Sequence, residues 1–406
     1  MRKKRYLKIA LVGGPMYDYP YSKIPEFERE TGYKVEIGAK LVHPKLNEHI
    51  ATLYSKGEGD YDLITTHSKY AASQGEWLTA LDADISDTEL SQFIPSTIEL
   101  MRIKGHLMQL PRNIDVKLVY YRKDLFDDPK EKETFQNKYG YSLKPPDTWE
   151  QLKDIANFFT RSPNLYGFVF PGRYSGLFGH FFELLTTAGG ILLDDNLKPQ
   201  FVNEAGEWAL GLLRSLYYED KVCPREVPEW HYDEVAQCFR DGKVAMTTDW
   251  PGSFATYKDP VLSKVGDKFA VAIYPIGPSG KRCVYAGGFS YAIPNSCHDR
   301  EGALALMRFL LSEKMQYEEA KRGAISVRKL AQQKIREEAM PGSLEEKRLK
   351  MLEETVANFM LIPPKLAKYP AIEDALWINL QKGYKGECSV KEALTQAAEK
   401  INQILS

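Results

Sequence analysis

The chain has 406 residues, of which 43% are hydrophobic and 27% are charged, and its formal net charge at pH 7 is -1. This composition is typical of a soluble globular protein, and a charge so close to zero provides no general electrostatic attraction to nucleic acid or to an anionic membrane. The length suggests two large domains, since one domain usually holds about 150 residues, and no segment approaches the roughly 18–20 apolar residues that span a bilayer.

The amino-terminal residues 1–8 resemble the charged start of a secretory signal peptide. Only residues 9–12 follow as an apolar segment, whereas a signal peptide needs an apolar core of about 7–15 residues. The sequence as given therefore predicts no signal peptide, and residues 8–12 are better interpreted as a first buried strand. Two alternatives stay open, namely a leader that was removed or lies upstream of Met1, and a binding protein of the cytoplasm.

Short apolar segments then alternate with amphipathic ones, which predicts an α/β architecture. The predicted strands are 8–12, 33–37 and 61–65, and the predicted helices between them are 22–31 and 43–56. Because the carboxyl ends of parallel strands meet at one edge of a sheet, the loops at 13–17 and 66–69 should open onto one cleft. The Gly13–Gly14 pair is not a dinucleotide-binding motif, because the remaining glycine spacing and the acidic residue that follows it are absent.

A proline-stiffened linker at residues 143–152 leads into a further helix. Asp147 or Thr148 can cap this helix, and Trp149 begins its apolar face. We expect Trp149 to be a core residue.

Five cysteines are spread along the chain, at positions 223, 238, 283, 297 and 388. Their spacing fits no zinc site, and their odd number leaves at least one thiol without an intramolecular disulfide partner. We expect them to act as small buried hydrophobic residues. No nucleophile elbow, phosphate-binding loop or other catalytic motif occurs, so the sequence predicts no catalytic residue, no metal and no cofactor.

Three segments, 143–152, 242–252 and 287–294, follow one another in the order and at the spacing of a known family. Weaker matches accompany them at residues 27–35, 59–67, 110–126, 188–195 and 393–405. In these segments, which extend over nearly the whole chain, the sequence resembles the extracellular (periplasmic) solute-binding proteins of ABC importers. The resemblance is to the maltose-binding-protein-like type that carries sugars and oligosaccharides.

The resemblance implies an α/β, two-lobed periplasmic-binding-protein type II fold with three interdomain crossings and a central ligand cleft. The amino-terminal lobe would contain residues 1–112 and 270–313, and the carboxyl-terminal lobe residues 117–266 and 318–406. The hinges would lie near 111–117, 268–275 and 313–325.

The resemblance also implies the substrate-binding component of an ABC importer, which captures a sugar, oligosaccharide or sugar derivative by hinge closure and delivers it to membrane permease subunits. The expected partners are the carbohydrate and the permease, with no nucleic acid. A monomer in the periplasm or outside the cell, lipid-anchored or secreted, is expected. The sequence does not specify the sugar, or whether it is neutral or acidic.

Sugars are bound by polar side chains that hydrogen-bond to neighbouring hydroxyls and by aromatic rings that pack on the C–H faces of the sugar ring. Both kinds of residue occur where the family motifs carry the ligand site over to this chain. The candidate ligand-binding residues are Tyr17, His67, Lys69, Asn113, Asp115, Arg173, Tyr174, Trp250, Gly288 and Phe289. The missing side chains of Gly287 and Gly288 should let a ligand approach backbone amides closely.

Structural roles are the alternative for several of these residues, since Asp115 could simply pair with Lys117 or Arg112. Two α/β lobes about a cleft also describe many transferases, in which His67, Asp115 and Glu183 could act as acid–base groups. A two-lobed α/β transferase and a cytoplasmic sugar sensor are therefore the alternative functions. The binding protein is favoured, because scattered polar residues suffice for binding and are insufficient evidence for turnover.

Overall fold

The computed structural model describes residues 5–14, 17–43 and 45–406. The described residues divide into two compact units. Unit 1 lies within Met1–Asp115, Gly287–Ala339 and Pro363–Tyr369, and unit 2 comprises Val116–Ala286, Met340–Ile362 and Pro370–Ser406.

The borders of these units differ from the predicted lobe borders in three segments, one of which, 363–369, is predicted in the second lobe but belongs to unit 1. Residues 270–286 are predicted in the first lobe but belong to unit 2, because β11 (Phe269–Ala272) pairs with β8 (Leu118–Arg122). Residues 318–339 are predicted in the second lobe but belong to unit 1, where α14 (Glu313–Lys321) packs against α15 (Lys329–Glu338).

A five-stranded sheet forms the centre of unit 1, in the order β2-β1-β3-β13-β6. The first three strands are parallel, and β13 is antiparallel to both of its neighbours. Their bounds are β1 (Tyr6–Val12), β2 (Lys34–Leu41), β3 (Leu63–His67), β13 (Phe289–Ala292) and β6 (Leu110–Pro111). The strands predicted in the first third of the chain are therefore confirmed, with ends shifted by a few residues.

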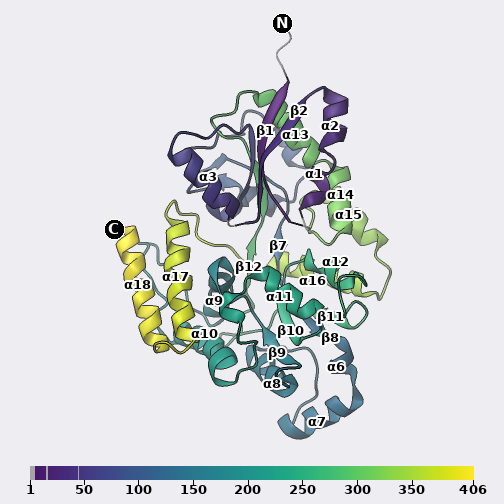
Figure 1. Cartoon of the computed structure of the whole chain (residues 1–406), viewed down its shortest axis with the longest axis vertical. Coiled ribbons are helices and arrows are strands. Elements are labelled where there is room, and N and C mark those ends of the chain that lie inside the picture. Colours follow the sequence, from purple (N-terminus) through teal and green to yellow (C-terminus); the bar gives the residue numbers. More distant parts are fainter. Residues whose placement is uncertain (1–4, 15–16, 44) are drawn as a thin grey trace. The chain divides into compact units, whose positions relative to one another are not determined.

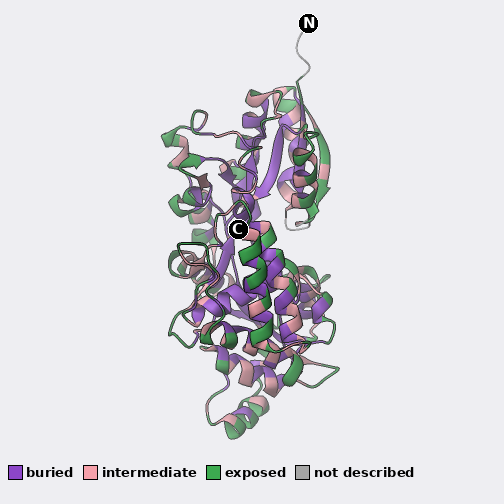
Figure 2. Ribbon diagram, turned by 90° about the vertical axis from the view of Figure 1, so that its left-hand side faces the viewer, coloured by how far each residue is buried: buried purple, intermediate pink, exposed green. Residues whose placement is uncertain are grey.

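Helices cover the sheet of unit 1, with α3 (Lys45–Ser55) on one side of β1 and β2 and α2 (Ile24–Thr31) and α13 (Arg300–Leu310) on the other (Figure 1). Leu46 and Ile50 of α3 pack with Ala10 and Val12 of β1, and residues 9–12 of this strand are buried; buried residues are purple in Figure 2. The remaining elements of unit 1 are α1 (Asp18–Tyr21), η1 (Ser68–Tyr70), α4 (Asp87–Leu90), α5 (Pro95–Leu100), β4 (Arg102–Ile103) and β5 (His106–Leu107). The short strand β7 (Asp115–Val116) lies at the border of the units.

A four-stranded sheet forms the centre of unit 2, in the order β11-β8-β10-β9. Strand β10 (Val244–Asp249) is parallel to β9 (Tyr166–Val169) and antiparallel to β8. A separate parallel pair joins β12 (Val284–Gly287) to β14 (Met360–Leu361). The helices are α6 (Lys123–Asp127), α7 (Pro129–Tyr139), α8 (Trp149–Phe159), α9 (Tyr174–Thr187), α10 (Glu204–Arg214), η2 (Ser215–Glu219), η3 (Val227–Glu229), α11 (Tyr232–Arg240), α12 (Ser253–Lys258), α16 (Leu344–Asn358), α17 (Tyr369–Tyr384) and α18 (Val390–Leu405).

Helix α8 begins where the proline-stiffened linker predicts it. The Thr148 side chain accepts a hydrogen bond from the Gln151 backbone N–H at 3.2 Å, which caps the helix as expected. Trp149 is 1% exposed, so its predicted place in the core is confirmed.

The register of both sheets gathers the ends of several strands at one edge. In unit 1, His67 at the end of β3 lies opposite Phe289 at the start of the antiparallel β13. In unit 2, the parallel strands β9 and β10 end side by side, with Val169 paired to Thr247, so the segments that follow them leave from the same edge. These two edges carry most of the predicted site residues.

Among the described residues, none of the helices has the length and apolar character that crossing a bilayer demands. The five cysteines are unpaired, and Cys223 and Cys238 are buried while the other three are partly exposed. The expectation of small buried residues therefore holds for two of them.

Candidate ligand-binding site

An aromatic cluster surrounds Phe289 at the strand-end edge of unit 1. The ring of Phe289 meets the rings of Tyr17, His67 and His43 edge-on, with centroid distances of 5.0, 5.1 and 5.3 Å. Tyr17 lies just after Pro15 and Met16, which are outside the described residues. The structure thus brings together three predicted residues and adds His43, whose loop position after β2 gave no signal in the sequence.

At the two glycines before Phe289, other parts of the protein occupy the space that a side chain would fill. A Cβ atom on Gly288 would lie 2.1 Å from the backbone oxygen of Asn113, and one on Gly287 would lie 2.5 Å from Cε1 of His67. The N–H of Phe289 donates to Oδ1 of Asn113 at 3.1 Å. The expectation that these glycines let a ligand reach free backbone amides is therefore not met at Phe289, because Asn113 already uses that amide.

Lys69 is only 3% exposed, which is unusual for an ammonium group. Its Nζ lies 4.8 Å from the ring centroid of Tyr70 and 5.9 Å from that of Tyr369, so two aromatic faces hold the cation. Burial and the neighbouring Lys69 charge lower the pKa of His67 well below its usual range. His67 is therefore a neutral imidazole at physiological pH, suited to hydrogen bonding rather than to charge pairing.

Asp115 is in neither of the ion pairs that the sequence left open for it. Arg112 pairs instead with Glu319 of α14, and Lys117 pairs with Glu183. The Asp115 carboxylate accepts a hydrogen bond from Nδ2 of Asn113 at 2.6 Å. Burial raises the pKa of Asp115 to about 6, so this carboxylate is costly to ionise where it stands and gains from further hydrogen-bond donors.

Trp250 follows β10 and is half-buried in unit 2. Its ring lies 5.3 Å from that of Tyr232 and 6.4 Å from that of Tyr285, both edge-on, and Nζ of Lys117 lies 5.3 Å from its centroid. Trp250 is thus held by three residues that the sequence did not connect with it.

Arg173 and Tyr174 start helix α9 after β9. Tyr174 has a φ of 52°, in the left-handed region that costs a non-glycine residue free energy, and it is 38% exposed. Its ring meets that of Trp377 on α17 at 5.0 Å, while a terminal nitrogen of Arg173 lies 3.6 Å from Oε1 of Glu234. Backbone strain on an exposed aromatic residue is the kind of feature that accompanies a binding function.

Two predicted residues of unit 2, Tyr174 and Trp250, belong to one aromatic series, since the ring of His231 lies 6.0 Å from that of Tyr174 and 4.4 Å from that of Tyr232. The series links Trp377, Tyr174, His231, Tyr232, Trp250 and Tyr285. Tyr174 is exposed, and His231, Tyr232, Trp250 and Trp377 are partly exposed. Such aromatic side chains can pack on C–H surfaces and donate hydrogen bonds, which is what a carbohydrate requires.

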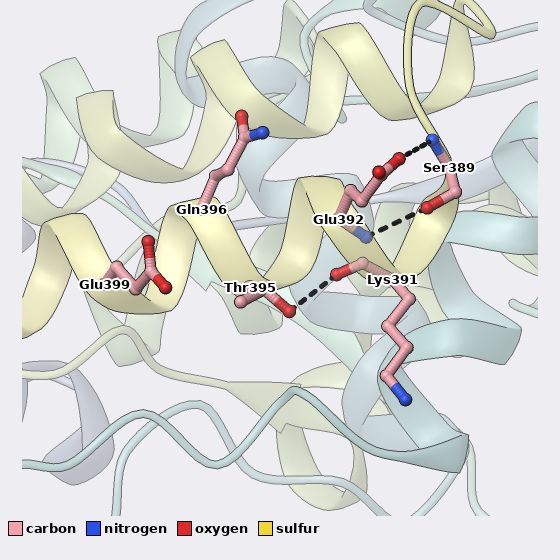
Figure 3. Close-up of a pocket in the computed structure, with 6 residues that line it drawn as sticks. All are labelled: Ser389, Lys391, Glu392, Thr395, Gln396 and Glu399. Carbon is pink, nitrogen blue, oxygen red and sulfur yellow. Dashed lines mark hydrogen bonds between the residues drawn. The ribbon is translucent and has the colours of Figure 1, made fainter.

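A concave feature lies on the surface of α18. An open depression of about 410 Å³ is lined by the six residues drawn in Figure 3, namely Ser389, Lys391, Glu392, Thr395, Gln396 and Glu399. The Ser389 and Glu392 side chains bond to each other's backbone N–H groups as a capping box. The depression is therefore the solvated face of an amphipathic helix and not a candidate site.

The catalytic alternative gains nothing from the geometry. Glu183, one of its imagined acid–base groups, is 0% exposed and its carboxylate is bonded to protein donors. Within the part of the chain that the structure describes, no three His, Cys, Asp or Glu side chains come together as metal ligands.

Sequence comparison gives a family match over most of the chain. The family described as bacterial extracellular solute-binding protein matches residues 14–317. A probable ABC transporter-binding protein of Deinococcus radiodurans is 27% identical over 286 residues, which cover 67% of this chain and 64% of that protein. The mannitol-binding protein of Pseudomonas aeruginosa is 27% identical over 277 residues, which cover 66% of this chain and 60% of that protein. The match spans less than two thirds of the length of these relatives.

Solved structures agree with this assignment over the whole chain. The structure of maltose-bound MalE3 of T. maritima is 25% identical, with a TM-score of 0.86, and covers 98% of this chain and 99% of that one. A solute-binding protein of Thermotoga lettingae bound with alpha-D-tagatose is also 25% identical, with a TM-score of 0.83, and covers 99% of this chain and 100% of that one. The predicted fold class is therefore confirmed, and the chain belongs to the family of bacterial extracellular solute-binding proteins.

Proposed function

We propose that this protein binds a neutral sugar or polyol and presents it, unchanged, to the permease subunits of an ABC importer. Membership of a family of binding proteins supports binding without turnover. The names of similar proteins, which refer to maltose, tagatose and mannitol, support the ligand class.

The proposal of a neutral ligand rests on one observation, namely that the basic side chains among and beside the candidate residues already interact with carboxylates or aromatic rings of the protein. Arg112 is paired with Glu319, Lys117 with Glu183, and Arg173 with Glu234. The ammonium of Lys69 is held over two aromatic rings. An acidic sugar would have to compete with these carboxylates and rings, whereas hydroxyl groups need only hydrogen-bond partners such as Asp115 and His67.

Capture by closure is part of the same proposal. Both units contribute candidate residues, so a ligand that contacts them together would favour a closed state over an open one. The hinges near 111–117, 268–275 and 313–325 are part of this proposal. Of the elements in these ranges, β11 lies within unit 2 and α14 within unit 1. We further propose a monomer that works outside the cytoplasmic membrane, secreted or lipid-anchored.

A thermal-shift series tests the ligand class. The protein is heated with D-mannitol, maltose or D-glucuronate at equal concentrations, and binding to the native state raises its melting temperature by mass action, at about 2.7 kcal/mol when the ligand is at a hundred times its Kd. We expect a shift with at least one of the two neutral compounds and none with the acidic one. A shift with D-glucuronate alone would contradict the proposal.

A further inference from the structure

A buried ion pair lies beside the proposed stacking residue Trp250. Lys117 and Glu183 are each 0% exposed, and Nζ of Lys117 lies 2.9 Å from Oε2 of Glu183. Lys117 stands between β7 and β8, while Glu183 lies on α9, 66 residues further along. The pair therefore connects the start of a sheet strand with the helix that begins at Arg173 and Tyr174.

The Glu183 carboxylate is the centre of a wider network. Oε2 also accepts from the Tyr274 hydroxyl at 3.3 Å and faces Nδ1 of His180 at 3.2 Å, and Oε1 accepts from the Tyr285 backbone N–H at 2.7 Å. Burial lowers the pKa of His180, so its ring is neutral and donates from Nδ1. One carboxylate thus fixes α9, the segment after β11 and strand β12 to Lys117.

Fold stability alone does not account for this arrangement. The desolvation of two buried charges offsets most of their mutual attraction, and apolar residues of similar volume often serve a core as well or better. Buried charges do fix a definite geometry, because each carboxylate lone pair and ammonium proton needs a partner in the right direction. The question is which group this geometry holds in place.

The structure indicates that the group is the indole of Trp250. Nζ of Lys117 lies over this ring, 5.3 Å from its centroid, and Tyr285, whose backbone N–H is bound by Glu183, meets it edge-on at 6.4 Å. We propose that the Lys117–Glu183 pair is a positioning device that fixes Trp250 and occupies one face of its indole, which leaves the opposite face for a neutral sugar or polyol. The ligand named in this inference rests on the proposed function. The positioning of Trp250 rests on the contacts described above.

A charge-free pair of substitutions separates positioning from folding. Lys117→Met keeps an unbranched chain without the charge but leaves a lone buried carboxylate, so this single variant is expected to be destabilised. The double variant Lys117→Met/Glu183→Gln removes both charges and keeps similar volumes. We expect it to fold with a melting temperature within a few degrees of the wild type.

The position of Trp250 is read from ¹⁹F NMR spectra of protein labelled with 5-fluorotryptophan. The chain has six tryptophans, and loss of one signal in Trp250→Phe assigns the resonance of interest. In the unliganded double variant we expect this signal to shift or broaden while the signals of Trp77, Trp208, Trp230 and Trp377 stay in place. Trp149 packs on His180 and Tyr274, which are bonded to Glu183, so its signal does not serve as a reference. Affinity for whichever of D-mannitol and maltose the wild type binds should fall at least tenfold in calorimetry.

Leu394→Ala, in the buried face of α18 in the same unit, is the control for general destabilisation. It should lower the melting temperature and leave the Trp250 signal unmoved. The proposal is overturned if the double variant leaves the Trp250 signal unchanged, or if Leu394→Ala perturbs that signal equally. A wild-type protein that binds neither compound would refute the proposed function, while the ¹⁹F spectra of the unliganded protein would still decide the positioning.

Discussion

Replacement of Trp250 by alanine is the most informative perturbation of the candidate site. The indole is half-buried and is held by Lys117, Tyr232 and Tyr285. A sugar that packs on its free face would lose burial and stacking worth about 1–3 kcal/mol, which corresponds to a loss of affinity of roughly 5- to 150-fold. We therefore expect Trp250→Ala to weaken binding at least about fivefold while unfolding stays cooperative.

The assay is isothermal titration calorimetry with the neutral ligand identified by thermal shift, combined with urea denaturation of the same samples. Trp208→Ala is a suitable control, because Trp208 is also half-buried in unit 2 but lies on α10 outside the aromatic series. The control should keep wild-type affinity. Unchanged affinity in Trp250→Ala would refute the stacking role, and a large loss of stability without any effect on binding would show that Trp250 is only a core residue.

Four further predictions follow from named contacts. Burial raises the pKa of Asp115 to about 6; the native state therefore holds this proton more tightly than the unfolded chain, and stability is lost as pH rises from about 4 to 6. Asp115→Asn should remove that loss, so the melting temperature of the variant minus that of the wild type should increase between about pH 4 and pH 6 and stay constant above it. A difference that does not change with pH would contradict this prediction. Thr148→Ala, which removes the α8 cap, should lower the unfolding free energy by about 1 kcal/mol in urea titrations, and an unchanged midpoint would be inconsistent with the cap. Arg112→Met, which strands the buried Glu319 carboxylate, should cost about 3–5 kcal/mol, and adding Glu319→Gln should restore most of it; equal losses in both variants would refute a charge effect. Saturating neutral ligand should reduce the radius of gyration in solution scattering, whereas tight binding with an unchanged profile would remove the proposed closure.

The sequence predicted the parts of this protein that depend on local patterns. Strand and helix periodicity placed the first elements, and the proline-stiffened linker located α8 and the buried Trp149. The order and spacing of several short segments were enough to identify the family. These signals are local because hydrophobic periodicity and capping act over a few residues.

The arrangement of side chains at the candidate site could not be predicted from the sequence. The ring of His43 contacts that of Phe289, which is about 250 residues away in the sequence, and Lys117 forms its ion pair with Glu183 and not with the nearby Asp115. Sheet register and the desolvation cost of each charge determine which residues pair, and neither has a local sequence pattern. The same reason explains why residues 270–286 fall in unit 2, since the pairing of β11 with β8 is a long-range contact.

Native mass spectrometry distinguishes capture of a neutral ligand from its conversion, because it reports binding, stoichiometry and the mass of the ligand. Protein is mixed with D-mannitol, maltose and D-glucuronate in competition, and the bound compound is released by denaturation and weighed. We expect one chain carrying one neutral molecule whose mass is unchanged after release. A bound acidic sugar in preference to both neutral compounds, or recovery of a converted product, would contradict it.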